Sequence, residues 1–273
     1  MQEFFAFGYN KSGTTFLQKL LDGHPAVNCP PEHHLTTIVE HLRHLARSYR
    51  DVIEQIDRNT ARQGLRYSED GVLRAGVPAL VRAFMREGAG PGTTHVGLND
   101  NTLGLNLPLF ARLLPEARFI GIVRDPREIA VSLHHHRIRT EPAYLEADSL
   151  DKTASAVGEA WAEHMRRISA FQRDQAFADR LVVIRYEDLS GPEGAAQLDH
   201  IFRHLGVACE RGQPAQIMAE VDVGMRRKAS PGYLRGGPSD SWRTELSPAQ
   251  ITVLEGRASA HMKGLGYPPQ TAP

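Results

Sequence analysis

The stretch that decides the fold lies near the start of the chain and reads FFAFGYNKSGTTFL over residues 4–17. It begins with an apolar run of strand length, continues through a loop bounded by Gly8 and Gly13, and opens a helix at Thr14. Apolar side chains then recur at the spacing of one buried helix face, at Phe16, Leu17, Leu20 and Leu21. A strand, a loop and a helix N-terminus in this order form an anion site, because free backbone N–H groups and the helix dipole both favour negative charge there.

The loop has the glycine spacing of the P-loop that binds nucleoside triphosphates, G-x-x-x-x-G-K-[ST], but its lysine is elsewhere. Thr14 stands where that motif needs lysine, and the lysine is Lys11, inside the loop. A P-loop kinase is therefore the weaker of two interpretations. It would also need an acidic metal ligand after a strand, for which Asp100 and Asp125 are the candidates.

With its lysine inside the loop, the segment K-S-G-T-T-F resembles the 5′-phosphosulfate loop of sulfotransferases that use 3′-phosphoadenosine 5′-phosphosulfate (PAPS). The resemblance implies that PAPS is the co-substrate and PAP the product. Backbone amides and hydroxyls of the loop would hold the phosphate, and Lys11 would meet the charge that develops on the bridging oxygen. The loop residues implied in cofactor binding are Lys11, Ser12, Gly13, Thr14 and Thr15.

A second segment, FIGIVRDPREIAVSL at residues 119–133, supports the first. It predicts a buried strand and then a helix, with Asp125 as the N-cap and proline at the first helical position. The segment resembles the 3′-phosphate segment of sulfotransferases, which implies Arg124 and Ser132 as ligands. An arginine fork at a strand end suits a phosphate. A structural cap is the alternative role for such an arginine.

The resemblance extends to R-Y-E-D-L at residues 185–189, where it implies that Tyr186 contacts the adenine, with Phe16 on the other face of the base. Both aromatic residues could instead be plain core. In the basic, glycine-rich part near the C-terminus the match is partial, and it implies Arg235, Gly236 and Gly237 as 3′-phosphate ligands. Rivals for that role are the basic residues at 226–228, and a solvated basic loop is the alternative.

The general base is the residue that the resemblance identifies least directly. The sequence D-x-H-P-x-V at residues 22–27 is similar to tyrosyl-protein sulfotransferases, and the alignment implies Glu32 as the base. Cytosolic members carry a histidine after the strand that here ends near Asp100, and this chain has none there. Asp100 and His33 are the other candidates, and a surface carboxylate in a proline-rich turn is the alternative for Glu32.

Composition sets bounds on the partners. Lys plus Arg and Asp plus Glu both number 32 in 273 residues, so no global field favours nucleic acid, and any anion site is local. No metal is expected, because the histidine runs at 33–34 and 134–136 are contiguous and do not converge as ligands. Two cysteines, no signal peptide and no apolar run of membrane-spanning length favour a cytoplasmic protein with no membrane partner. The expected acceptor is a small-molecule or glycan hydroxyl, or a tyrosyl group; the oligomeric state stays open.

The predicted fold class is α/β, a three-layer sandwich around a parallel sheet, in one domain over residues 1–273. Its expected strands lie near residues 3–8, 95–98, 118–123 and 181–185. Residues 36–90 are predicted to form a helical insertion that covers the acceptor, with a loop at 63–76; packing helices alone are the alternative. Besides the kinase, a non-catalytic PAP-binding protein remains open.

Overall fold

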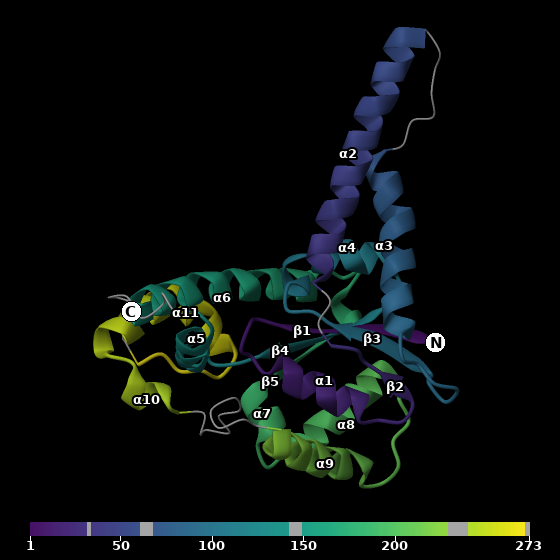
Figure 1. Ribbon diagram of the computed structural model, residues 1–273. Coiled ribbons are helices and arrows are strands. Elements are labelled where there is room, and N and C mark those ends of the chain that lie inside the picture. The colour runs from purple at the N-terminus through teal and green to yellow at the C-terminus, as the bar shows by residue number, and fades with distance from the viewer. Residues whose placement is uncertain (32–33, 61–67, 142–148, 229–239, 271–273) are drawn as a thin grey trace.

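The structure, a computed structural model, describes residues 1–31, 34–60, 68–141, 149–228 and 240–270, without the side chains of 224–228. Within these residues five strands form one parallel sheet in the order β2-β3-β1-β4-β5 (Figure 1). The strands are β1 (Gln2–Gly8), β2 (Val27–Asn28), β3 (His95–Asn99), β4 (Arg118–Val123) and β5 (Leu181–Arg185). The predicted parallel α/β sheet is confirmed. The edge strand β2 was not predicted, since two residues are too few to show a period.

Helices cover both faces of the sheet (Figure 1). They are α1 (Thr14–Asp22), α2 (Leu35–Thr60), α3 (Glu69–Arg86), α4 (Leu107–Leu113), α5 (Pro126–Thr140), α6 (Ser149–Arg173), α7 (Tyr186–Ser190), α8 (Gly194–Leu205), α9 (Gln213–Lys228), α10 (Trp242–Glu245) and α11 (Pro248–Gly264), with 3₁₀ turns at Leu103–Leu105 and Ala178–Arg180. None of the described helices combines the length and apolarity needed to cross a bilayer.

The core is split into two halves by the alternation of side chains along β1. Phe5 and Phe7 point to the layer that contains α3, α4, α6 and α11, whereas Phe4 and Ala6 point to the layer of α1, α8 and α9. Residues 4–8 are all buried, which is why this strand reads as a continuous apolar run instead of an alternating one.

The central position of β1 brings the loop that follows it to the carboxyl edge of the sheet. β1 pairs with β3 on one side and with β4 on the other, and Gly8 lies opposite Ile122. A Cβ on Gly8 would lie 2.5 Å from the Ile122 carbonyl oxygen, so the chain leaves the sheet here only with glycine. Ligand sites in open α/β sheets lie at this edge.

Helices α2 and α3 pack together as a hairpin, and the outer half of α2 extends away from the α/β body (Figure 1). At the base, Leu35, Val39 and Val77 are buried in the core cluster that also contains Phe5 and Leu98. The base is therefore packing structure. The outer half of α2 projects beyond the sheet (Figure 1), and cover of the acceptor by this insertion stays a prediction.

Two further expectations are corrected. The loop expected at 63–76 is wrong for residues 69–76, which belong to α3 behind the N-cap Ser68; residues 61–67 lie outside the described part. At Gly76, helix α3 packs closely against α2, since an added Cβ would lie 3.3 Å from the Leu42 side chain. Residues 226–228 form the end of α9 and not the beginning of a basic loop.

Candidate active site

The loop between β1 and α1 is a tight turn with an unusual backbone at its lysine. The Ser12 N–H donates to the Tyr9 carbonyl at 3.0 Å, which closes the turn. Lys11, the third residue of this turn, has φ 70°, a left-handed conformation that glycine or asparagine normally supplies. Such strain is held in place by surrounding structure and concentrates at functional sites.

The N-terminus of α1 lies open next to this turn. Gly13 is its N-cap with φ 96°, no side chain of the described residues caps the helix, and the first turn carries no acidic residue. A Cβ on Gly13 would lie 2.3 Å from the Tyr186 ring, so the cradle is shaped by that ring. Ser12 is fully buried, and its Oγ has no hydrogen-bond partner among the described residues. A buried hydroxyl of this kind normally has a partner, and an anion bound at the helix N-terminus would provide one.

Arg124 connects the end of β4 to this loop. Its Nη1 donates to the Lys11 carbonyl at 3.2 Å, and its guanidinium lies 4.6 Å from the centre of the Tyr186 ring. Its Nη2 lies 3.5 Å from the Glu128 carboxylate. The Nε of Arg124 is buried and has no partner within the described part of the chain, so one donor of the fork is open to a ligand.

Basic side chains of α5 lie beside Lys11. Burial lowers the pKa of Lys11 below its usual value, and repulsion from the Arg139 guanidinium lowers it further. The pKa of His136 is also lowered, first by burial and then by Lys11 and Arg139. Burial is the larger cause in both cases, and the added repulsion indicates that these three basic side chains lie near one another, where a bound anion would be favoured.

Sequence reasoning missed His136 and Arg139 as members of this site. The signal that could have found them is helical spacing, because they follow the predicted ligand Ser132 by four and seven residues and share its face of α5. Ser132 itself is half-buried on that helix. Its contact with a 3′-phosphate stays a prediction.

A buried carboxylate joins Arg124 to the C-terminal part of the chain. Glu128, nearly completely buried, accepts from the Trp242 N–H and from the Ser241 Oγ, both at 3.1 Å. Burial raises the pKa of Glu128, and the Trp242 N–H and the Arg124 charge oppose that rise. The predicted ligands Arg235, Gly236 and Gly237 lie outside the described residues, so their role stays a prediction. Ser241 and Trp242, which follow these residues in the chain, donate hydrogen bonds to Glu128. The same carboxylate forms an ion pair with Arg124.

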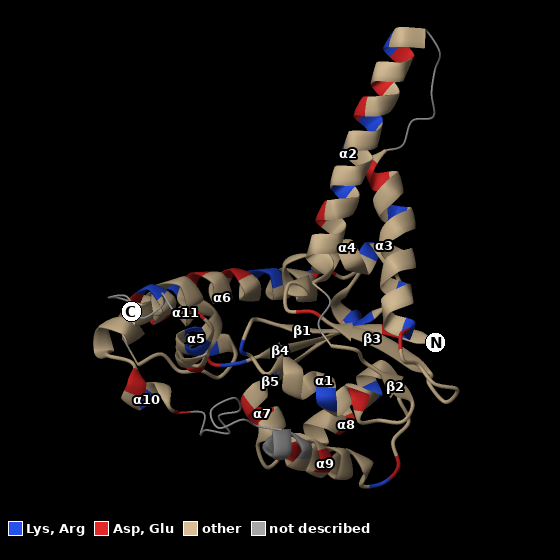
Figure 2. Cartoon of the chain, viewed as in Figure 1, with Lys and Arg blue, Asp and Glu red and all other residues tan. Residues whose placement is uncertain are grey.

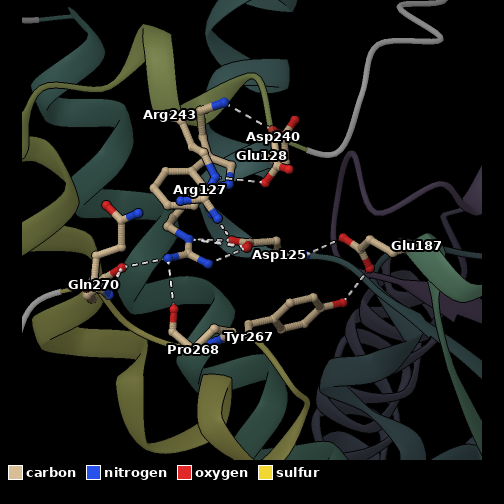
Figure 3. Close-up of polar contacts among 11 residues, drawn as sticks. Asp125, Arg127, Glu128, Glu187, Asp240, Arg243, Tyr267, Pro268 and Gln270 are labelled. Carbon is tan, nitrogen blue, oxygen red and sulfur yellow. Dashed lines mark hydrogen bonds and ion pairs between the residues drawn. The ribbon is translucent and has the colours of Figure 1, made fainter.

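The first turn of α5 is fixed by a buried ionic network (Figure 3). Asp125 caps the helix as predicted, by accepting from the Arg127 N–H at 2.9 Å. The Arg127 guanidinium binds Asp125 at 2.6 Å and Glu255 at 2.8 Å, and it lies 3.8 Å over the Trp242 ring. Glu187 accepts from the Asp125 N–H at 3.1 Å and from the Tyr267 hydroxyl at 2.6 Å. These contacts join β4, α5, α7 and the C-terminal segment into one support for Arg124.

Phe16 and Tyr186, the residues expected to contact the adenine, lie close to each other, but their rings are not parallel. The Phe16 and Tyr186 rings are 6.2 Å apart between centroids and meet edge to face at 72°. Tyr186 also packs on Gly13 and under Arg124. Its ring is therefore a wall of the phosphate cradle, and binding of adenine by the two rings stays a prediction.

Of the predicted bases, the structure describes Asp100. It is fully buried, and its carboxylate accepts from the N–H groups of Leu35, Thr102 and Leu103 and from the Thr102 hydroxyl. A carboxylate that accepts so many hydrogen bonds anchors the start of α2 and the turn after β3. The other two candidates, Glu32 and His33, lie outside the described residues.

The described donor groups of this site are those of an anion site. Within the described residues, no group of three or more His, Cys, Asp or Glu side chains is placed to hold one. The cradle instead offers backbone N–H groups, a buried hydroxyl, a lysine and an arginine. This donor set fits the phosphate and sulfate oxygens of PAPS.

The fold and the loop define a class of protein: an α/β protein that binds an anion where the central strand meets a helix. Comparison with known proteins identifies its family. A model described as "Sulfotransferase family" matches residues 3–211. The chain belongs to the sulfotransferase family.

Two relatives share part of this sequence. Protein-tyrosine sulfotransferase 1 of Danio rerio is 24% identical over 190 residues, which cover 68% of this chain and 48% of that protein. Omega-hydroxy-beta-dihydromenaquinone-9 sulfotransferase Stf3 of Mycobacterium bovis is 30% identical over 112 residues, 40% of this chain and 28% of that protein. The chain thus spans about half the length, or less, of these relatives.

The solved structures share the fold. Mouse sulfotransferase SULT7A1, solved with PAP, superposes with a TM-score of 0.60 at 15% identity, over 97% of this chain and 89% of that one. The sulfotransferase domain from the curacin biosynthetic pathway superposes with a TM-score of 0.59 at 19% identity, over 97% of both chains.

Proposed function

We propose that this protein transfers the sulfuryl group of PAPS to a hydroxyl acceptor and releases PAP. The observation that carries the proposal is the cradle at the end of β1. There the N-terminus of α1 and the Ser12 hydroxyl, neither of which has a side-chain partner among the described residues, lie with the Arg124 fork around a loop that contains Lys11. Thr14 stands where a P-loop kinase has its lysine. This arrangement supports sulfuryl transfer over phosphoryl transfer.

The residues of the cradle have separate tasks in this reaction. PAPS, when bound, supplies the sulfuryl group and the leaving phosphate. The amides at the start of α1, with Ser12, Thr14 and Thr15, hold the 5′ end of the nucleotide. Arg124 contributes its fork to a phosphate. Lys11 stabilises the negative charge that develops on the leaving oxygen, as a preorganised cation in a partly desolvated site.

Proton removal from the acceptor hydroxyl is assigned to Glu32, by its similarity to the tyrosyl-protein enzymes. Asp100 is the weaker candidate because its oxygens are occupied by Leu35, Thr102 and Leu103. His33 remains the third candidate. A positioned base contributes about 10²–10⁴ in rate, so Glu32→Gln should lose that much turnover while PAP affinity stays within about threefold. Normal turnover of Glu32→Gln, with a loss in His33→Ala, would move the assignment to His33.

The acceptor class is a hydroxyl on a tyrosyl peptide, a sugar or another small molecule. Support for this class comes from the relatives, whose names refer to protein tyrosine and to an omega-hydroxy menaquinone. A cytoplasmic location is the prediction that accompanies this function, and it rests on cysteine usage. Cys29 and Cys209 are free thiols in the structure.

The test compares ligands and then reactions. PAP at about 100 times its dissociation constant should stabilise the fold by about 2.7 kcal/mol, a rise in melting temperature of about 5 °C or more. ATP with magnesium should do much less. Radiolabelled PAPS should then label hydroxyl acceptors in the presence of EDTA. Equal stabilisation by ATP and PAP would favour the kinase. Strong PAP binding without transfer to any acceptor of a broad panel would favour a non-catalytic PAP-binding protein.

A further inference from the structure

Helix α6 carries a buried histidine that packs against the loop of the cradle. The His164 side chain belongs to a residue that is 2% exposed. Its ring lies 6.1 Å from the ring of Phe7 at the end of β1 and 6.1 Å from the ring of Tyr9, measured between centroids. Tyr9 begins the turn that ends at Ser12. Helix α6 therefore contacts the first residue of the turn that contains the lysine (Figure 2, where the lysines and arginines are blue).

The turn that follows β3 fixes the position of the His164 ring. A Cβ added to Gly104 would lie 2.0 Å from Cε1 of that ring, so the imidazole occupies the space that a side chain at position 104 would take. One turn further along α6, the Arg167 guanidinium donates to the Leu105 carbonyl at 2.7 Å. Helix and turn are thus joined at two adjacent residues, and the ring has little freedom to move.

The chemistry of His164 differs from that of an ordinary core residue. Burial lowers its pKa to about 4, and repulsion from Arg167 adds to this effect, so the ring is neutral at physiological pH. Its Nε2 is buried and has no hydrogen-bond partner among the described residues. Such an atom costs free energy that an apolar side chain would not, and in a folded protein it calls for a functional explanation.

The loop itself needs support at both ends. Lys11 has φ 70°, a conformation that the surrounding structure must maintain. Arg124 holds the Lys11 carbonyl at 3.2 Å, and the contact between His164 and Tyr9 holds the start of the turn. We propose that His164 is a positioning residue, which fixes Tyr9 and thereby keeps Lys11 in its left-handed, partly buried place. Only the effect on rate rests on the proposed sulfuryl transfer.

The first experiment measures the pKa of Lys11 with no nucleotide or acceptor added. Trace acetylation over a pH series, read for each lysine by mass spectrometry, gives this pKa from the rate of labelling. In His164→Ala the released loop should bring Lys11 into solvent, so its pKa should rise toward that of an ordinary lysine, about 10.4.

The matched control is another buried histidine, His24 (4% exposed), whose ring packs on Phe202 in the opposite layer. His24→Ala should leave the pKa of Lys11 at its wild-type value. An unchanged Lys11 pKa in folded His164→Ala would overturn the proposal, and so would an equal rise in both variants. If His164→Ala does not fold, His164→Gln gives the same comparison.

A second substitution disturbs the same contact from its other side. Gly104→Ala displaces the imidazole, so it should move the pKa of Lys11 in the same direction as His164→Ala. In the His164→Ala background the added methyl group enters space that the ring has left, so Gly104→Ala should cost much less stability there than in the wild type. Equal costs in the two backgrounds, measured by urea unfolding, would contradict the proposed contact.

A kinetic cycle tests the link to the reaction. His164→Ala should lower kcat about tenfold or more, because a displaced catalytic group loses its alignment. In the Lys11→Gly background the same substitution should cause no further loss. A loss of equal size in both backgrounds would overturn the proposal, since His164 would then act apart from Lys11. If the wild type transfers no sulfuryl group, the proposed function fails, while the shift in the Lys11 pKa still decides the role of His164.

Discussion

Because Lys11 has a left-handed backbone, which suits glycine, Lys11→Gly should remove the charge without destabilising the fold. Lys11→Ala and Lys11→Gly both remove the cation that we assign to the leaving oxygen. Removal of one preorganised donor costs about 10²–10³ in kcat, or about 2.7–4 kcal/mol of transition-state stabilisation. Because the charge acts in the transition state, kcat and kcat/KM should fall together, and PAP affinity should change only a few-fold.

The two substitutions differ in their effect on stability. With φ 70°, Lys11 occupies a conformation that costs a residue with a Cβ about 1–2 kcal/mol. Glycine relieves this cost, and its greater freedom in the unfolded chain cancels part of the gain. The melting temperature of Lys11→Gly should therefore match that of the wild type or exceed it by up to about 3 °C. Lys11→Ala should show no such gain.

A third variant supplies the pH control. The pKa of Lys11 is lowered by burial and then by Arg139, so its protonated fraction falls at a lower pH than that of an ordinary lysine. Turnover should fall on the alkaline side as this proton is lost. Lys11→Arg keeps a charge that does not titrate there and should remove this fall. Stopped-flow or radiolabel assays of sulfuryl transfer, with melting curves for each variant, measure these effects. Wild-type turnover in a folded Lys11→Gly variant would refute the reasoning.

Three further substitutions test the cradle and its support. Gly13→Ala should weaken PAP binding about tenfold or more and destabilise the fold by about 1–2 kcal/mol, because the φ of Gly13 is 96° and an added Cβ would lie 2.3 Å from the Tyr186 ring. Titration calorimetry measures the affinity, and scanning calorimetry measures the stability. The control is Gly256→Ala, because an added Cβ at Gly256 has open space around it. Arg124→Lys should weaken PAP about tenfold in the same titration because it loses the planar fork; unchanged affinity would exclude Arg124 as a phosphate ligand. Arg127→Ala should lower the free energy of unfolding by about 3–5 kcal/mol in urea, since it leaves buried carboxylates without their cation, whereas Arg257→Ala at an exposed ion pair should cost under about 1 kcal/mol. Equal losses in both arginine variants would contradict a stabilising role for the network.

The parts of the site that could be predicted are those encoded in short segments. An apolar run, glycine spacing and a displaced lysine predict the strand, loop and helix at residues 4–17, and the structure confirms them. The cap of α5 by Asp125 is equally local. Sequence analysis does not reach contacts between distant segments. Glu128 reads as an ordinary first-turn acid, yet it meets Trp242, which lies 114 residues later.

The errors in the helical regions have the same origin. Gly71 and Gly76 favoured a loop because glycine is a poor helix former, but at Gly76 the absence of a side chain lets α3 pack closely on α2. Helix α9 was missed because its apolar residues, among them Ile217, Met218 and Val221, pack on a core formed by other segments. In both places tertiary packing decides the local structure, and a single sequence does not show it.

The arrangement of charges explains why the cradle should prefer a polyanion to a single phosphate. Lys11 comes from the loop, Arg124 from the end of β4, and His136 and Arg139 from α5, so the cations reach one place from separate elements. Without a ligand this gathering of positive charge is unfavourable, and repulsion from Arg139 adds to the burial that lowers the pKa of Lys11. A ligand with anionic groups at both ends of a nucleoside relieves the repulsion at several points, while a ligand with charge at one end relieves only part of it. Since Arg124 is held by Glu128 and its neighbours before any ligand arrives, little ordering cost remains for binding. The selectivity for PAP over ATP should therefore arise from the spacing of these cations more than from their number.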